Sequence, residues 1–228
     1  PIDIVAVNLY PFAETVAREN VTLTDALEQI DIGGVTLVRA AAKNFQDVLV
    51  LVRPQDYVPV LQEWREQGEV SIETRRYLAA IAFQHTASYD STIATYLRTS
   101  TGDYFPEQLT LSLERVQPLR YGENPHQQAS FYRWADASSS TLPTVAGAEV
   151  LHGKELSFNN LLDLDTALSS VQSFTAPTIA IIKHTNPCGL ACDDTLVEAY
   201  KRAHAGDPVS AYGGIIGSNR PLDEATAN

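Results

Sequence analysis

The sequence predicts an α/β protein. Short apolar runs of strand length alternate with stretches of helical periodicity, which is typical of sheets covered by helices. The clearest strand lies at residues 178–182, an apolar run rich in β-branched side chains that leads directly into Lys183 and His184. In α/β folds such strands present reactive side chains at the carboxyl edge of the sheet. The chain has 228 residues and is 44% apolar, which is enough for a packed core.

The first half of the chain predicts two short strands with helices between and after them. The expected elements are a strand at 2–7, a turn at 8–12, a helix opened by a capping box at 22–25, a helix at 35–44 and a strand at 47–52. Residues 54–68 and 71–99 are expected to form long helices with polar surfaces that bridge two domains. Breakers at 99–106 indicate a linker. We therefore expect one domain at residues 1–102 and another at residues 103–228.

The second half repeats the alternation. The expected elements are a strand at 129–134, a Ser/Thr-rich loop at 135–144, a helix at 161–171, the strand at 178–183, a sharp turn at 185–187, a helix at 195–205 and a strand at 210–217. Glycines in the last strand allow a ligand to approach the backbone closely.

Composition narrows the range of functions. A net charge of −12 argues against nucleic acid as a partner, and any anionic substrate must be held by local Arg and Lys side chains. No apolar run is long enough to span a membrane. Two cysteines do not suggest a disulfide framework, so we expect a cytoplasmic protein. The chain begins at Pro1 and contains no methionine, and we expect it to be an internal piece of a longer protein.

Two polar groups of the second half are candidate site residues. Lys183 offers a point charge and His184 a base that titrates near neutrality, although both could be solvated residues at the end of a strand. Residues 119–127 place Arg120 and Tyr121 in a rigid turn, and a guanidinium there suits bidentate binding of a phosphate. The alternative is an ordinary loop arginine.

The first half holds a weaker constellation around a diglycine turn. Asp31 and Lys43 flank this turn and the helix that follows it. They come together only if the turn folds back, and otherwise they are an acid at a helix start and a solvated lysine. Asn8, Tyr10 and Arg39 are the other polar side chains of this region.

The two cysteines form a candidate metal site with a neighbouring histidine. His184, Cys188 and Cys192 are spaced four apart, which would form a stripe of ligands on a helix. Pro187 and Gly189 argue against a continuous helix. We therefore expect no zinc and two free thiols.

Five motifs, in order at residues 7–12, 30–34, 119–127, 183–189 and 212–214, give the sequence a resemblance to a known family. It resembles the bifunctional purine-biosynthesis enzymes that pair AICAR transformylase with IMP cyclohydrolase. The resemblance implies the C-terminal part of a methylglyoxal-synthase-like (Rossmann-like) cyclohydrolase domain, followed by the first part of a cytidine-deaminase-like transformylase domain. It also implies a homodimer in the complete protein.

The resemblance implies formyl transfer from 10-formyltetrahydrofolate to AICAR, followed by cyclodehydration of FAICAR to IMP. His184 would be the base, acting with the carboxamide of the substrate, and Lys183 would stabilise the oxyanion or help deliver a proton. Asn160 would orient the formyl group, or Asn159 if the register slips by one. The residues implied in AICAR binding are Arg120 at the phosphate, Tyr121 beside it, and Tyr212 and Gly213 as a wall of the pocket.

For the cyclohydrolase, the resemblance implies proton management by Tyr10, Asp31 and Lys43, with Asn8 contacting substrate. The family's first segment, with its phosphate-binding loop, is absent, so we expect no cyclisation by this chain alone. One alternative is an inactive ligand-binding or dimerisation module. Another is a zinc deaminase, a class related in fold to the transformylase, but the Cys188 spacing and the lack of an upstream His-x-Glu argue against it.

Overall fold

The computed structural model describes residues 2–135 and 143–227, so most of the loop expected at 135–144 lies outside the described residues. The chain divides into two compact units, Pro1–Leu113 with Trp134–Ser139 and Glu114–Arg133 with Ser140–Asn228. The proposed division at residues 102 and 103 falls just after the last long helix of the first unit. None of the described helices combines the length and the apolar character needed to cross a bilayer.

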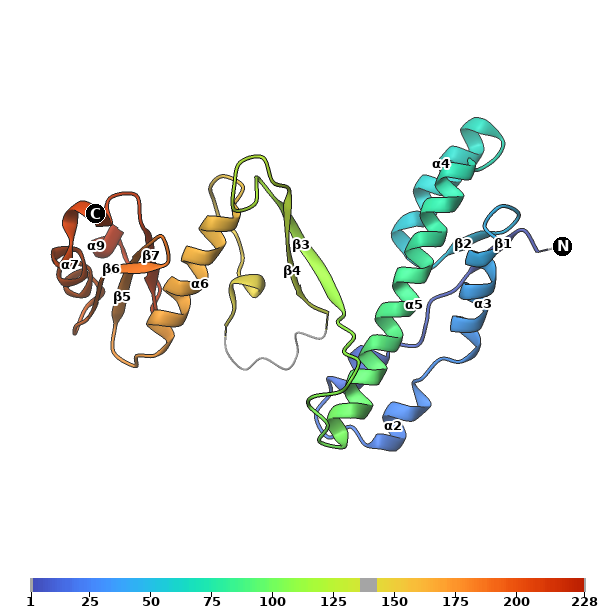
Figure 1. Cartoon of the computed structure of the whole chain (residues 1–228), viewed down its shortest axis with the longest axis horizontal. Coiled ribbons are helices and arrows are strands. Elements are labelled where there is room, and N and C mark those ends of the chain that lie inside the picture. The colour runs from blue at the N-terminus through green and yellow to red at the C-terminus, as the bar shows by residue number, and fades with distance from the viewer. Residues whose placement is uncertain (1, 136–142, 228) are drawn as a thin grey trace. The chain divides into compact units, whose positions relative to one another are not determined.

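The first unit combines one pair of parallel strands with several helices (Figure 1). Its elements are β1 (Ile4–Ala6), α1 (Phe12–Val16), α2 (Leu23–Glu28), α3 (Gly33–Lys43), β2 (Leu49–Leu51), the 3-10 turn η1 (Pro54–Asp56), α4 (Tyr57–Gln67) and α5 (Ile72–Ser100). The strands pair in parallel with Val5 opposite Val50. Thr22 begins α2 with a capping box, as its spacing to Asp25 predicts.

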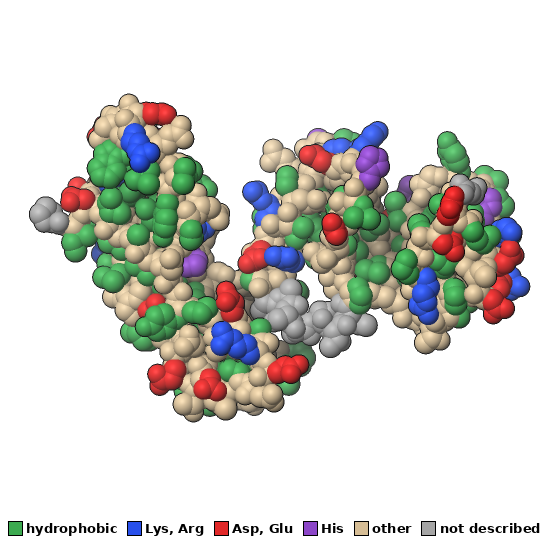
Figure 2. Space-filling model, turned by 180° about the vertical axis from the view of Figure 1, so that it is seen from behind, with side chains coloured by type: hydrophobic (Ala, Val, Ile, Leu, Met, Phe, Trp, Pro, Cys, Tyr) green, Lys and Arg blue, Asp and Glu red, His purple; other side chains and the backbone are tan. Residues whose placement is uncertain are grey.

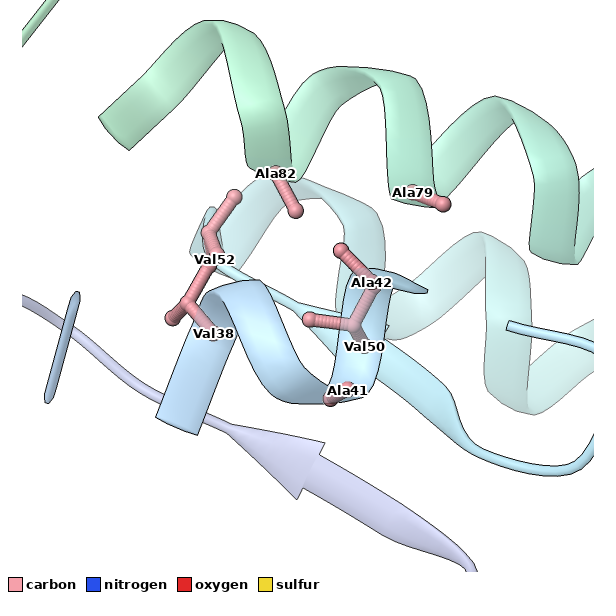
Figure 3. Close-up of a cluster of buried hydrophobic side chains, with 7 residues drawn as sticks. All are labelled: Val38, Ala41, Ala42, Val50, Val52, Ala79 and Ala82. Atoms are coloured by element: carbon pink, nitrogen blue, oxygen red, sulfur yellow. The ribbon is translucent and has the colours of Figure 1, made fainter. Parts of the chain in front are cut away.

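The core of the first unit lies where α3 and α5 meet β2. Small side chains three residues apart on each helix, Ala79 and Ala82 on α5 and Val38 and Ala41 on α3, pack with Val50 (Figure 3). Alanines on both helices allow the backbones to approach closely. The helix expected to bridge two domains is therefore a core element of the first unit.

The second unit contains a hairpin, a three-stranded sheet and the helices beside it (Figure 1). Its elements are β3 (Leu113–Leu119), β4 (Ala129–Trp134), the 3-10 turn η3 (Val145–Gly147), α6 (Phe158–Gln172), β5 (Thr178–Lys183), β6 (Asn186–Cys192), α7 (Leu196–Gly206), α8 (Pro208–Ala211), β7 (Ile215–Ser218) and α9 (Glu224–Ala227). The sheet has the strand order β6-β5-β7, and both neighbours run antiparallel to β5.

The central strand β5 is covered on both faces. Successive side chains of a strand point to opposite faces, so Ile179 and Ile181 pack in the cluster of α7 while Ala180 and Ile182 pack in the cluster of α6. All four side chains are buried. This two-sided burial explains why the sequence of β5 is a continuous apolar run and not an alternating one.

In the second unit, the turn after β5 and the last expected strand differ from their sequence-based expectation. The sharp turn expected at 185–187 is confined to His184 and Thr185, and Pro187 lies within β6. Pro187 is tolerated there because β6 is an edge strand of its sheet, and an edge strand has N–H groups that need no partner. The strand expected at 210–217 is shorter, since α8 occupies its first part.

Candidate active site

A strained turn presents the two reactive side chains at the end of β5. Lys183 is the last residue of the strand, and His184 and Thr185 follow with φ values of 52° and 59°. Each non-glycine residue in this left-handed region costs roughly 1 kcal/mol or more. Strain of this kind persists only where surrounding contacts enforce it, and such positions cluster at functional sites.

Three hydrogen bonds enforce the turn. The backbone N–H of Thr185 donates to Oδ1 of Asp163 on α6 at 2.7 Å. The carbonyl oxygen of His184 accepts from the Thr185 hydroxyl at 2.7 Å and from the side-chain amide of Asn186 at 2.8 Å. The imidazole of His184 is exposed and takes part in none of these bonds, so it is available to a substrate.

Lys183 is held against the loop that carries Tyr212. Its ammonium donates to the backbone carbonyl of Tyr212 at 2.8 Å, and Gly213 follows with a left-handed φ of 77° that favours glycine. Hydrogen bonds from Ser210 lower the pKa of the nearby Asp207 carboxyl, and the positive charge of Lys183 lowers it further. The structure thus brings Lys183 and the loop of Tyr212 and Gly213 together.

The loop with Arg120 is fastened to the start of α6. The N–H of Arg120 donates to the carbonyl of Leu156 at 3.1 Å, and the N–H of Phe158 donates to the carbonyl of Tyr121 at 3.3 Å. The side-chain amide of Asn159 donates to the carbonyl of Glu123 at 3.3 Å. Backbone pairing on both sides therefore fixes this loop against the helix.

The guanidinium of Arg120 is exposed and free to bind an anion. It stacks on the ring of Tyr121, with its central carbon 5.1 Å from the ring centroid, and forms no ion pair with any described carboxylate. A cavity of about 570 Å³ opens beside it, and His126, Ser130 and Tyr132 are among the lining residues. A stacked, unpaired guanidinium at a polar cavity suits a phosphate.

Asn160 has a structural task at the start of α6. Its Oδ1 accepts from the N–H and the hydroxyl of buried Ser157 at 3.1 and 3.0 Å, and its own N–H donates to the Ser157 hydroxyl at 3.3 Å. Because the Ser157 backbone N–H can only donate, the atom it meets must be the amide oxygen of Asn160. A substrate can therefore meet Asn160 only through its NH₂ group.

The first turns of α6 connect the two halves of this candidate site. Asn159 contacts the Arg120 loop and Asp163, one helical turn later, contacts the turn that carries His184. The loop of Arg120 and the turn of His184 are thereby attached to one rigid element, and Lys183 directly precedes that turn. Such a set can hold an anionic substrate, remove a proton and stabilise a developing negative charge.

In the first unit, Tyr89 of α5 gathers two of the predicted residues. Its hydroxyl accepts from the N–H of Asp31 and donates to the carbonyl of Gln29, both at 2.9 Å, and burial raises the pKa of this hydroxyl. Its ring also meets the buried ring of Phe12 edge-on, with centroids 6.3 Å apart. Exposed Tyr10 lies two residues before Phe12. Tyr89 therefore anchors the segments of both Tyr10 and Asp31.

Lys43 and Asn8 lie apart from this anchor. Asp31 precedes α3 and accepts the N–H of Gly34 at 2.6 Å, whereas Lys43 is the last residue of the same helix. Eleven residues of helix separate the two ends by about 15 Å. The structure does not bring Asp31 and Lys43 together, because the helix between them is straight. Asn8 accepts a long 3.4 Å hydrogen bond from the hydroxyl of Tyr57.

The histidine and the two cysteines do not form a cluster. Cys188 and Cys192 are free thiols four residues apart along β6, a spacing of about 13 Å in a strand, while His184 lies in the preceding turn. Across residues 2–135 and 143–227, no group of three or more acidic, histidine or cysteine side chains could hold a metal. On the face drawn in Figure 2, the Lys and Arg side chains of the described residues are scattered singly.

Sequence reasoning missed Asp163, Tyr89 and the cavity residues. Asp163 and Thr185 are 22 residues apart, and Tyr89 and Asp31 are 58 apart, so no local pattern links them. One signal was present in the sequence: Asn159 and Asp163 have the i,i+4 spacing of residues on one helical face. His126, which lines the cavity beside Arg120, lies within the motif at 119–127, but the sequence pattern did not assign it a binding or catalytic role.

Comparisons with known proteins identify the family of this chain. The model of the family described as the AICARFT/IMPCHase bienzyme matches residues 41–228. The chain is 56% identical over 227 residues to the bifunctional purine biosynthesis protein PurH of Bacillus cereus (strain G9842), and 55% identical to those of Bacillus anthracis and Bacillus mycoides (strain KBAB4). Each match covers 100% of this chain, which spans 44% of the length of these relatives. With more than half of its length matched by the family model, the chain belongs to the AICARFT/IMPCHase bienzyme family.

Proposed function

We propose that this chain forms part of a bifunctional enzyme of purine biosynthesis, a multifunctional transferase and hydrolase. The second unit contributes to formyl transfer onto AICAR, and the first unit contributes to cyclisation of FAICAR to IMP. The observation that carries the proposal is the attachment of the His184 turn and the Arg120 loop to the same helix, α6. Family membership and the relatives' printed names support the same reaction pair.

In the formyl transfer, the amine of AICAR attacks the formyl carbon of 10-formyltetrahydrofolate, the co-substrate. His184 is the base that removes a proton from this amine, and the carboxamide of the substrate assists it. The imidazole of His184 is exposed and therefore accessible to the substrate. Lys183 stabilises the negative oxygen of the tetrahedral intermediate or helps to deliver the proton that the departing folate nitrogen needs. Asn160 orients the formyl oxygen through its free NH₂ group, with Asn159 as the alternative.

Arg120 holds the phosphate of AICAR in the cavity beside it. The Tyr121 ring lies against the guanidinium and its hydroxyl accepts one long 3.4 Å hydrogen bond from it, so the other N–H groups can donate to an anion. Tyr212 and Gly213 lie beside Lys183, where they would contact AICAR on the side of the formyl transfer. The local positive charge of Arg120 offsets the unfavourable field of a chain with net charge −12.

In the cyclisation, the carboxamide nitrogen of FAICAR attacks the formyl carbon, a new C–N bond forms, and the formyl oxygen leaves as water. Tyr10 and Asp31 donate and accept the protons that move in this step. Tyr89 holds the chain segments that carry both residues. Asn8 contacts substrate. Lys43 acts from the far end of α3, which requires a substrate that extends along this helix or a different arrangement in the whole protein.

The proposed compartment, oligomeric state and ligands of the protein are those that the family resemblance implies. The natural protein acts in the cytoplasm as a homodimer, with AICAR, FAICAR, IMP and folate as its small-molecule ligands. Zinc takes no part in the proposed reaction, because His184, Cys188 and Cys192 do not converge on one point.

The test uses the natural protein that contains this chain, incubated with AICAR and 10-formyltetrahydrofolate and followed by mass spectrometry. We expect IMP from the unsubstituted protein and no formylated product from His184→Ala. Arg120→Ala is expected to weaken AICAR binding far more than folate binding. An unsubstituted protein that folds but forms no formylated product would refute the proposal, and equal losses for both ligands would refute the role of Arg120.

A further inference from the structure

We infer that Asp163 is a positioning residue for formyl transfer, because its carboxylate holds the left-handed turn that presents Lys183 and His184. The inference rests on the proposed role of His184 as the base. Asp163 itself touches no reacting atom in this assignment.

The contact is short and involves a charged acceptor. Oδ1 of Asp163, a half-buried residue of α6, accepts the backbone N–H of Thr185 at 2.7 Å. Hydrogen bonds to an ionised acceptor are shorter and stronger than neutral ones. No ion pair of the described residues involves Asp163, so its charge is directed at this one N–H group.

The antiparallel pairing of β5 with β6 closes the turn, with Lys183 opposite Asn186, and Asp163 adds a contact from outside this hairpin. The other bonds at its backbone come from the Thr185 hydroxyl and the Asn186 amide, and both would move with the turn. Positive φ at both central residues is usual in a two-residue hairpin turn, but His184 and Thr185 are not glycine and carry a strain of roughly 1 kcal/mol each, which the external contact helps to offset. Among the hydrogen bonds of the described residues, the one from Asp163 ties His184 and Thr185 to a helix.

That helix is also the anchor of the proposed phosphate site. Asn159 holds the carbonyl of Glu123 in the Arg120 loop, one turn before Asp163. Loss of Asp163 would therefore leave the phosphate site in place and let His184 move relative to it. A misplacement of about 1 Å at a reacting group can cost roughly 100-fold in rate.

The experiment compares three variants of the natural full-length protein. Asp163→Ala removes the acceptor, and Asp163→Asn keeps an oxygen that can accept the Thr185 N–H. Asp165→Ala is the matched control, since Asp165 is an exposed carboxylate on the same helix whose side chain forms no hydrogen bond or ion pair with any described residue. The measurements are kcat and KM for AICAR in formyl transfer, and hydrogen exchange of the Thr185 amide.

For Asp163→Ala we expect kcat to fall by about 10- to 100-fold, with KM for AICAR changed less than about 3-fold, and faster exchange of the Thr185 amide. Asp163→Asn is expected to restore most of kcat, and Asp165→Ala to match the unsubstituted protein. Exchange at Thr185 that is equal in Asp163→Ala and Asp165→Ala would overturn the inference, whatever the activities. So would a loss of kcat that Asp163→Asn does not rescue. If the unsubstituted protein formylates no AICAR, the proposed function fails instead, and the exchange result still decides whether Asp163 holds the turn.

Discussion

The close approach of β6 to α7 makes Gly189→Ala a sharp test of the second unit. A methyl group on Gly189 would overlap the carbonyl oxygen of Ala203 and lie 2.6 Å from the carbonyl carbon. Carbon atoms in ordinary contact are about 3.5–4.0 Å apart, so β6 and α7 would have to separate by about 1 Å. The obstructing atoms belong to backbone, and no change of rotamer can relieve them. Gly189 pairs with Ile181, so the separation would open the buried layer beside β5.

Overpacking of a core costs about 1–3 kcal/mol, and a backbone obstruction falls at the upper end, about 3 kcal/mol. For a protein of this size the melting temperature should drop by roughly 6–12 °C. Thermal unfolding followed by circular dichroism measures this. Gly147→Ala is the control, because among the described residues its methyl group would meet only the Thr144 hydroxyl, at 3.6 Å, and it should change the melting temperature by less than about 2 °C. A Gly189→Ala protein that melts with the control would refute the reasoning.

Three further changes test other contacts. Gly34→Ala would place a methyl group 2.5 Å from Oδ2 of Asp31 and break the hydrogen bond that the Gly34 N–H donates to this carboxylate. Denaturant titration should therefore show a free energy of unfolding that is lower by about 1–2 kcal/mol. Burial, and to a lesser extent the charge of Arg53, lowers the pKa of His85 in the folded protein below its unfolded value, so the stability that His85 contributes above pH 6.5 is lost as the pH falls. His85→Gln should therefore flatten the decline of the melting temperature between pH 7 and pH 5. Identical slopes for the variant and the unsubstituted protein would contradict this. Asn219→Ala removes three hydrogen bonds to the segment at the start of β5 and should lower the free energy of unfolding in urea by about 2–3 kcal/mol. A decrease of less than about 0.5 kcal/mol would contradict this stabilising role of Asn219.

Elements with strong local patterns were predictable. The apolar run of β5 and the capping box at Thr22 specify their structure within a few residues, because burial and helix-end hydrogen bonds act over short stretches of sequence. The strands β3 and β6 were not predicted. Their exposed or half-buried positions give no alternation, and Pro187 and Gly189 weaken strand propensity in β6, so pairing with β5 decides its structure.

The candidate site was predictable to a similar extent. The position of Lys183 and His184 after a buried strand, and the exposure of Arg120, followed from local sequence. The family resemblance, confirmed by the comparisons, supplied the reactions. The bond between Asp163 and Thr185 could not be foreseen, because it depends on how α6 packs beside β5.

The two anchors on α6 also limit how the length of this segment can vary. Asn159 and Asp163 are one turn apart, so their side chains leave the same face of the helix about 6 Å from each other. An insertion or deletion of a single residue between them would rotate Asp163 by about 100° around the helix axis and away from Thr185. Substitutions at exposed positions such as Asp165 leave this spacing unchanged. Homologous chains should therefore differ freely in the composition of this helix but keep the same number of residues between the two anchors.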